Sequence, residues 1–173
     1  MHRIETARLT LEPQTAAHAE EMFAVLSDPA IYEYENEPPP SIEWLRARFA
    51  KLESRRSPDG QEQWLNWVIR LPSSELIGYV QATVRFNGRA AIAYELSSAY
   101  WGQGLAKHAV QAMIVELAER YRVRSLSAVF KCANQRSQRL LERLGFSLAS
   151  REEHVKGQVA PGELLMHREI QRT

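Results

Sequence analysis

The fold of this chain is decided at the stretch Trp101-Gly102-Gln103-Gly104-Leu105-Ala106. An apolar run over residues 91–96 precedes it and predicts a strand, and an amphipathic helix is expected after it over residues 105–121. Glycine allows a tight turn and a close approach of the backbone to a ligand. The first N–H groups of a helix have no internal partner and, with the helix dipole, favour a phosphate or pyrophosphate. The pattern therefore predicts an anion site at this turn.

Periodic segments on both sides of the turn predict a single domain over residues 1–173. Alternation predicts strands over residues 8–13, 63–71, 76–86, 90–96, 126–130 and 164–169, and another that begins at Phe146. Periodicity and capping residues predict helices from Thr15 to Leu26, from Ser41 to Arg55, over 105–121 and from Asn134 to Gly145. This order predicts an α+β (mixed α/β) fold, with a central mixed, mostly antiparallel sheet flanked by helices.

Charge and cysteine content exclude several classes of function. The net charge is +1, so nothing steers the chain to nucleic acid or to a membrane surface. The single cysteine, Cys132, excludes an internal disulfide, and a buried, inert thiol is expected there. The histidines lack metal-ligand spacing, so no metal is expected. We also expect no signal peptide or membrane span, and a cytoplasmic location.

The glycine turn by itself leaves its ligand open. It lacks the Gly-Lys pair of a P-loop, and Lys107 stands at the third glycine position of a dinucleotide-binding fingerprint. A turn that merely allows the helix to begin is the alternative to a phosphate site.

Two motifs in the second half of the chain resemble the GNAT superfamily of acyl-CoA-dependent N-acetyltransferases. The family's acetyl-CoA motif is Arg/Gln-x-x-Gly-x-Gly/Ala; Gly104 and Ala106 match its last positions, and Trp101 stands at the arginine or glutamine position. Residues 100–106 are similar to the RimJ/RimL-like branch, which acetylates ribosomal protein N-termini. The second motif is Asn134-x-x-Ser137-x-x-Leu140-Leu141-x-x-Leu144-Gly145-Phe146. The resemblance covers nearly the whole chain, because two further stretches fit: Glu5-Thr6-x-Arg8-Leu9-x-Leu11 and Ile77-Gly78.

The resemblance implies acetyl-CoA as co-substrate and a sheet that splays at the cofactor site. Pantetheine would pair with the open edge from Tyr94 to Ser97, and the N–H near Leu96 would polarise the thioester carbonyl. Pyrophosphate would bind the N–H groups of Gly102, Gln103, Gly104, Leu105, Ala106 and Lys107. A solvated helix residue is the alternative for Lys107.

Asn134 and Ser137 would complete the donor site. Asn134 would hydrogen-bond the pantetheine amides or serve as a plain N-cap, and the two roles can coexist. Leu141 stands where many superfamily members have a tyrosine that acts as general acid. Ser137 would therefore orient the leaving thiolate, and a small residue that permits close packing is the alternative.

The acceptor implied by the resemblance is a primary amine, with a protein N-terminal α-amino group favoured. The candidate bases are Glu163, slightly favoured, then Glu95, with Glu35 and Glu37 as further carboxylates. The residues expected to contact the acceptor are Tyr34, Glu35 and Tyr94. A small-amine, polyamine or aminoglycoside acetyltransferase, or a non-catalytic acyl-CoA sensor, is the alternative. Both a monomer and a homodimer are compatible with the sequence.

Overall fold

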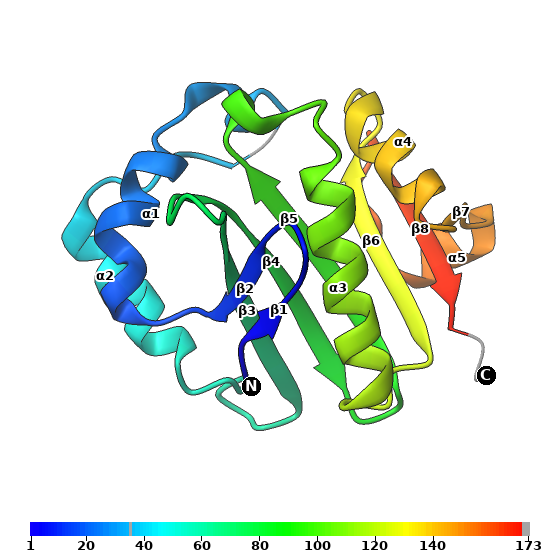
Figure 1. Cartoon of the computed structure of the whole chain (residues 1–173). Helices are drawn as coiled ribbons and strands as arrows, with labels where there is room; N and C mark the ends of the chain where they lie inside the picture. Colours follow the sequence, from blue (N-terminus) through cyan, green and yellow to red (C-terminus); the bar gives the residue numbers. More distant parts are fainter. Residues whose placement is uncertain (35, 171–173) are drawn as a thin grey trace.

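Eight strands form one sheet in the computed structural model, which describes residues 1–34 and 36–170 (Figure 1). The order across the sheet is β1-β2-β3-β4-β5-β6-β8-β7. Neighbouring strands are antiparallel, except that β5 and β6 are parallel. The strands are β1 (Ile4–Glu5), β2 (Thr10–Pro13), β3 (Glu62–Arg70), β4 (Leu76–Arg85), β5 (Arg89–Leu96), β6 (Ser125–Lys131), β7 (Ser147–Leu148) and β8 (Glu163–Glu169).

Five α-helices in the described residues cover this sheet, and the predicted α+β fold with a mixed, mostly antiparallel sheet is confirmed. None of these helices is long and apolar enough to cross a membrane. The helices are α1 (Ala19–Leu26), α2 (Ile42–Leu52), α3 (Leu105–Glu119), α4 (Gln135–Arg143) and α5 (Arg151–Lys156). Three short 3₁₀ turns lie at η1 (Ala16–His18), η2 (Pro29–Tyr32) and η3 (Ser98–Tyr100).

The structure corrects the sequence expectation at a few element ends. Helix α3 ends at Glu119 rather than at residue 121, and the first helix begins as the 3₁₀ turn η1. Strand β1 and helix α5 were not expected, because two residues are too few to show alternation and six too few to show helical periodicity. Gly145, the last residue of the expected helix, has the left-handed backbone typical of a helix end, with a φ of 80°.

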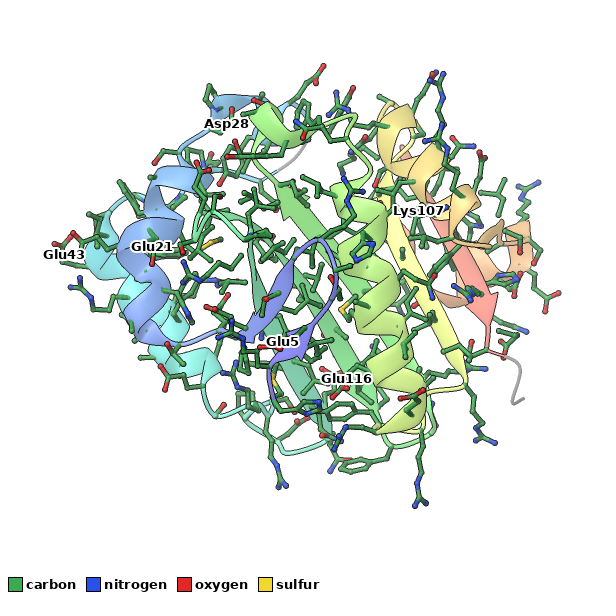
Figure 2. All side chains as sticks on the ribbon, viewed as in Figure 1. Glu5, Glu21, Asp28, Glu43, Lys107 and Glu116 are labelled. Carbon is green, nitrogen blue, oxygen red and sulfur yellow. The ribbon has the colours of Figure 1, made fainter. Side chains whose placement is uncertain are left out.

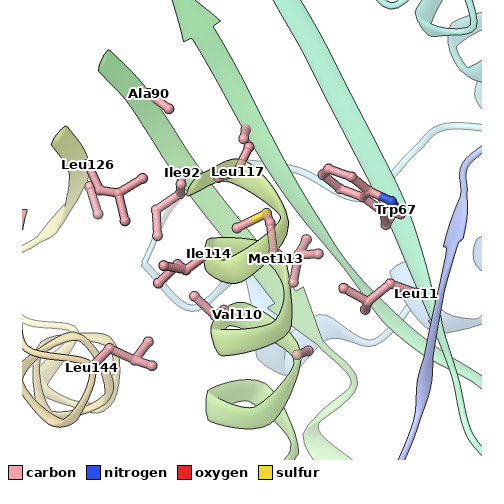
Figure 3. Packing of buried hydrophobic residues seen from close by; sticks show 14 of the residues in the cluster. Leu11, Trp67, Ala90, Ile92, Val110, Met113, Ile114, Leu117, Leu126 and Leu144 are labelled. Carbon is pink, nitrogen blue, oxygen red and sulfur yellow. The ribbon is translucent and has the colours of Figure 1, made fainter. Parts of the chain in front are cut away.

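The two faces of the sheet carry two separate hydrophobic clusters. Alternate residues of β3 point to opposite faces, so Trp67 and Ile69 join the cluster under α3, whereas Val68 joins the cluster of α1 and α2. The buried side of α3 carries Leu105, Ala109, Met113 and Leu117. Figure 3 shows Met113 and Leu117 of α3 among the buried residues of this cluster. The α3 face and the α1–α2 face are thus distinct environments on one sheet.

Strands β5 and β6 separate along their length. Their paired positions run only from Arg89 opposite Ser125 to Ala91 opposite Ser127. At the joined end, the N–H of Arg124 donates to the carbonyl of Gly88 over 2.8 Å. Beyond Ala91 the two strands have no paired positions in the described chain, so residues 92–96 of β5 face an opening where the resemblance implied a splayed sheet.

Candidate active site

A cavity of about 870 Å³ passes through the opening between β5 and β6. On the α3 face its wall includes Ala106 of α3 and Leu140 and Leu141 of α4. On the α1–α2 face its wall includes Leu45 and Phe49 of α2. The separated strands themselves line the middle, through residues 92–96 of β5 and 128–130 of β6. One continuous space therefore reaches both faces of the sheet.

The backbone of β5 is oriented toward this opening at the predicted position. The N–H of Ser97 donates to the carbonyl of Ile77 on β4 over 2.9 Å. Because consecutive residues of a strand direct their N–H and C=O groups to opposite edges, those of Leu96 face away from β4 and toward the opening. The indole Nε1 of Trp101 donates to the Leu96 carbonyl over 2.9 Å, which leaves the N–H of Leu96 as the donor directed into the opening.

The glycine turn has the backbone geometry of an anion site. Gly102 and Gly104 have φ of 75° and 74°, and a Cβ added at Gly102 would meet no atom within 4 Å. The carbonyl of Gly104 accepts from the N–H of His108, so α3 begins directly after the turn. Its first N–H groups point out of the helix. Lys107 lies exposed in this first turn, as Figure 2 shows.

The N-terminal segment supports the glycine turn. This support was not predicted from the sequence. The guanidinium Nη2 of Arg8 donates to the carbonyl of Gln103 over 3.0 Å, and the Thr6 hydroxyl lies 2.9 Å from His108 Nε2. Arg8 thereby brings a positive charge to the turn. Arg8 belongs to the N-terminal motif, but a contact across 95 residues of sequence leaves no periodic signal.

Asp28 is a second support that the sequence did not reveal. Its Oδ2 accepts from the N–H of Ser98 over 2.7 Å. Hydrogen bonding by Ser98, first through its side chain and then through this N–H, lowers the pKa of Asp28. Figure 2 shows Asp28 beside the connection between β5 and α3. The carboxylate therefore stays ionised and holds η3 in place.

Helix α4 brings Ser137 to β5. The side-chain oxygen of Asn134 accepts from the N–H of Ser137 over 3.1 Å, so the predicted N-cap is confirmed. The hydroxyl groups of Ser137 and Tyr94 share a hydrogen bond of 2.7 Å. Burial raises the pKa of Tyr94 to about 12, so this phenol is protonated at neutral pH. The two hydrogen-bonded hydroxyl groups lie at the wall of the cavity, where they can donate a proton.

Arg136 lies at the cavity, and Cys132 differs from the sequence expectation. The guanidinium of Arg136 lies 3.5 Å from the ring centre of Trp101 and lines the cavity. Cys132 is exposed and lies outside the cavity wall, so the expectation of a buried thiol was wrong. It follows the last residue of β6, where the chain leaves the sheet.

The two main carboxylate candidates occupy different environments. Glu95 lines the cavity and pairs in register with Tyr79, on the α1–α2 face. Its negative charge contributes to the raised pKa of Tyr32, about 12, whose main cause is burial. Glu163 lies at the start of β8, outside the cavity wall, with its Oε1 2.7 Å from Lys131 Nζ. That hydrogen bond lowers the pKa of Glu163.

The remaining acceptor candidates lie in the loop after α1. Tyr34 and Glu37 line the cavity, whereas Glu35 lies outside the described residues. Over residues 1–34 and 36–170, no group of three or more histidine, cysteine or acidic side chains is placed to hold a metal ion.

Comparison with known families places this geometry. The acetyltransferase (GNAT) domain matches residues 8–147. The chain belongs to the GNAT acetyltransferase family. Acetyl-CoA is the acetyl donor of this family.

Related proteins agree with this assignment. The uncharacterized N-acetyltransferase p20 of Bacillus licheniformis is 28% identical over 84% of this chain and 83% of its own length. The uncharacterized N-acetyltransferase YoaA of Bacillus subtilis (strain 168) is 27% identical, over 83% of this chain and 81% of its own.

Solved structures show the same fold. RimL, a ribosomal L7/L12 alpha-N-protein acetyltransferase in complex with coenzyme A, has a TM-score of 0.79 at 20% identity, covering 97% of this chain and 98% of its own. The ribosomal-protein-S5-alanine acetyltransferase of Vibrio fischeri has a TM-score of 0.77 at 17% identity, with 96% of each chain covered.

Replacing Gly78 with alanine is expected to disturb the donor site. A Cβ at Gly78 would lie 2.1 Å from the Glu95 carbonyl oxygen and 2.8 Å from Leu96 Cα. Strand β5 must therefore shift at Leu96, whose N–H points into the opening. Calorimetry should show acetyl-CoA binding weakened about tenfold or more, equivalent to about 1.4 kcal/mol. Gly60→Ala is the control: its φ of 72° means that alanine strains the backbone there, but the added Cβ would meet no atom within 4 Å and Gly60 lies outside the cavity wall, so acetyl-CoA affinity should be retained. Equal affinities for both variants would contradict the expectation.

The buried phenol of Tyr94 is expected to ionise late. Its folded pKa of about 12 lies above the ordinary value of about 10, so its contribution to stability is complete below pH 10 and is lost as the pH rises toward 12. In an alkaline titration followed by tyrosinate absorbance, Tyr94→Phe should remove amplitude near pH 12. Amplitude lost near pH 10 instead would show that Tyr94 is solvated.

Proposed function

We propose that this acetyltransferase transfers the acetyl group to a primary amine by direct attack in a ternary complex, and that the acceptor is a protein N-terminal α-amino group. The observation that carries the proposal is that one continuous cavity passes through the opening between β5 and β6. Donor and acceptor can enter from opposite faces of the sheet and meet beside Leu96 and Glu95, which line its middle.

On the donor side, each part of acetyl-CoA has a partner. The pyrophosphate binds the N–H groups of residues 102–107, with Lys107 and Arg8 adding positive charge. Pantetheine pairs with the edge from Tyr94 to Ser97, and the free side-chain N–H₂ of Asn134 reaches its amides. The N–H of Leu96 donates to the thioester oxygen, where negative charge develops.

The reaction forms one C–N bond and breaks one C–S bond. The neutral amine attacks the thioester carbon, the C–S bond breaks, and the ammonium that forms gives one proton to a base. The thiolate of coenzyme A leaves and receives a proton through the hydroxyl pair of Ser137 and Tyr94. A thiol has a pKa of about 8.5, so the pair mainly orients a leaving group that needs little assistance.

Glu95 is the proposed base, acting through a water molecule, in preference to Glu163. Glu95 lies on the cavity wall where donor and acceptor would meet, and Glu163 does not. The lowered pKa of Glu163 beside Lys131 also makes it a weaker proton acceptor.

The choice of an α-amino acceptor is supported by two arguments. An α-amino group, with pKa about 7.7–8.0, costs about 1 kcal/mol to deprotonate at pH 7, whereas a lysine amine costs about 4.6 kcal/mol, so one carboxylate suffices for the former. A polyamine site is expected to be strongly acidic, yet the described cavity wall balances two carboxylates, Glu37 and Glu95, with two guanidinium groups, Arg48 and Arg136. The fold similarity to RimL adds to this preference.

The acceptor is tested by thiol release from acetyl-CoA with three panels of amines: peptides with free N-termini, polyamines and aminoglycosides. Peptides are expected to give the highest kcat/KM, with mass spectrometry locating the acetyl group on the α-amine. A higher kcat/KM for polyamines or aminoglycosides would replace the proposed acceptor. Acetyl-CoA binding without thiol release on any panel would support a sensor instead.

The base is tested by comparing Glu95→Gln with Glu163→Gln. Loss of the base should lower kcat/KM of Glu95→Gln by about 100-fold or more, with acetyl-CoA affinity retained. Glu163→Gln removes an ion pair outside the cavity wall and should stay within about threefold of the parent enzyme. The reverse order would identify Glu163 as the base.

A further inference from the structure

Three side-chain amides lie in a row across the α1–α2 face of the sheet. Gln14 follows β2, and its N–H donates to the carbonyl of Asn66 on β3 over 2.9 Å. Asn66 pairs in register with Gln81 on β4, which pairs with Ala93 on β5. Alternation places these residues on the same face as Glu95, two residues further along β5. All of them line the cavity, and we name Gln14, Asn66 and Gln81 the amide row.

Gln14, at the far end of the row, has an unsatisfied donor. Its side chain is buried, with 3% of the residue exposed. Its backbone is fully engaged, because the N–H donates to Asn66 and the carbonyl accepts from the guanidinium of Arg55. The side-chain nitrogen Nε2, however, is buried with no hydrogen-bond partner in the described chain. A buried donor without a partner destabilises the protein, and a hydrogen bond to a ligand oxygen would remove this cost.

The surroundings of the row indicate the chemistry of that ligand. Apolar side chains of α2 form part of the same cavity, at Leu45, Phe49 and Leu52. Asn66 is itself buried, with 6% exposed. Uncharged amides between apolar walls suit neutral carbonyl groups and give no counterion to a polycation.

We propose that the amide row binds main-chain carbonyl groups of an extended peptide acceptor, with Gln14 donating to about its fourth residue. The inference rests on the proposed function, since the α-amine must lie beside Glu95. Adjacent strands are about 4.8 Å apart, and Gln14 follows β2, which is three strands from β5. The distance from Gln14 to β5 across the sheet is therefore about 14 Å. An extended peptide advances about 3.3 Å per residue, so about four residues span this distance. Gln81, one strand away, then meets about the second residue.

The test measures peptide binding to the protein saturated with coenzyme A, which cannot transfer acetyl. Calorimetry uses one alanine-based series of one to six residues, with a free N-terminus and an amidated C-terminus. Affinity is expected to rise up to about four residues and then to remain constant. Affinity independent of length, or no binding at millimolar peptide, would overturn the proposal.

Substitutions locate the steps of this length dependence. Gln14→Met keeps the side-chain length but removes the donor, so it should weaken tetra- and hexapeptides about five- to tenfold and leave mono- and dipeptides unchanged. Gln81→Met should weaken all peptides from the dipeptide onward. Gln111→Met, on the exposed surface of α3, is the matched control and should change nothing. Equal weakening at every length by Gln14→Met would indicate a purely structural role and overturn the assignment.

The amide row and the proposed function fail in distinguishable ways. Thiol release from acetyl-CoA with the same peptides reports on the function, and the dead-end complex with coenzyme A reports on the row. Peptides that are acetylated at rates independent of length and of Gln14→Met would overturn the row alone. Length-dependent binding without thiol release would overturn the function alone. Spermidine binding that is lost in Gln14→Met would overturn the peptide assignment.

Discussion

The separation of β5 from β6 is the constraint on which the rest of the site depends. A paired β6 would occupy the edge of β5 and close the sheet; after Ala91 and Ser127 the pairing ends, and the cavity passes through the gap. Strand β5 stays on β4, because Gly78 allows the two backbones to approach more closely than a Cβ would permit. The departure of β6 therefore exposes the backbone edge of β5 without distorting the antiparallel half of the sheet.

Three contacts from different parts of the chain keep this edge and the glycine turn in position. The carboxylate of Asp28 accepts a hydrogen bond from the N–H of Ser98. The indole of Trp101 donates to the carbonyl of Leu96, and the guanidinium of Arg8 donates to the carbonyl of Gln103. Each contact fixes a connection that glycine and 3₁₀ geometry would otherwise leave mobile. On the proposed function, the N–H of Leu96 is thereby preorganised to stabilise the thioester oxyanion.

Sequence patterns predicted most elements of the fold, because periodicity and capping are local signals. The N-cap at Asn134 is confirmed for that reason. Helix α5 also carries a local signal in the sequence, the capping pair Ser150 and Glu153, which marks the start of a helix. Contacts that depend on strand register left no such signal. The amide row, the bond from Arg8 and the pairing of Glu163 with Lys131 each join segments that only the folded sheet brings together.

A neutral amide row also suits the chemistry better than an acidic acceptor site would. Carboxylates around an amine stabilise its protonated form, and each unit by which they raise the amine pKa adds about 1.36 kcal/mol to the cost of forming the nucleophile. Binding through carbonyl groups four residues away supplies affinity without that cost. On the proposed function, the α-amine is then left beside the carboxylate of Glu95, which needs only to accept the proton released as the C–N bond forms. Peptide affinity is thus assigned to the amide row and amine deprotonation to Glu95, at opposite ends of the same face of the cavity.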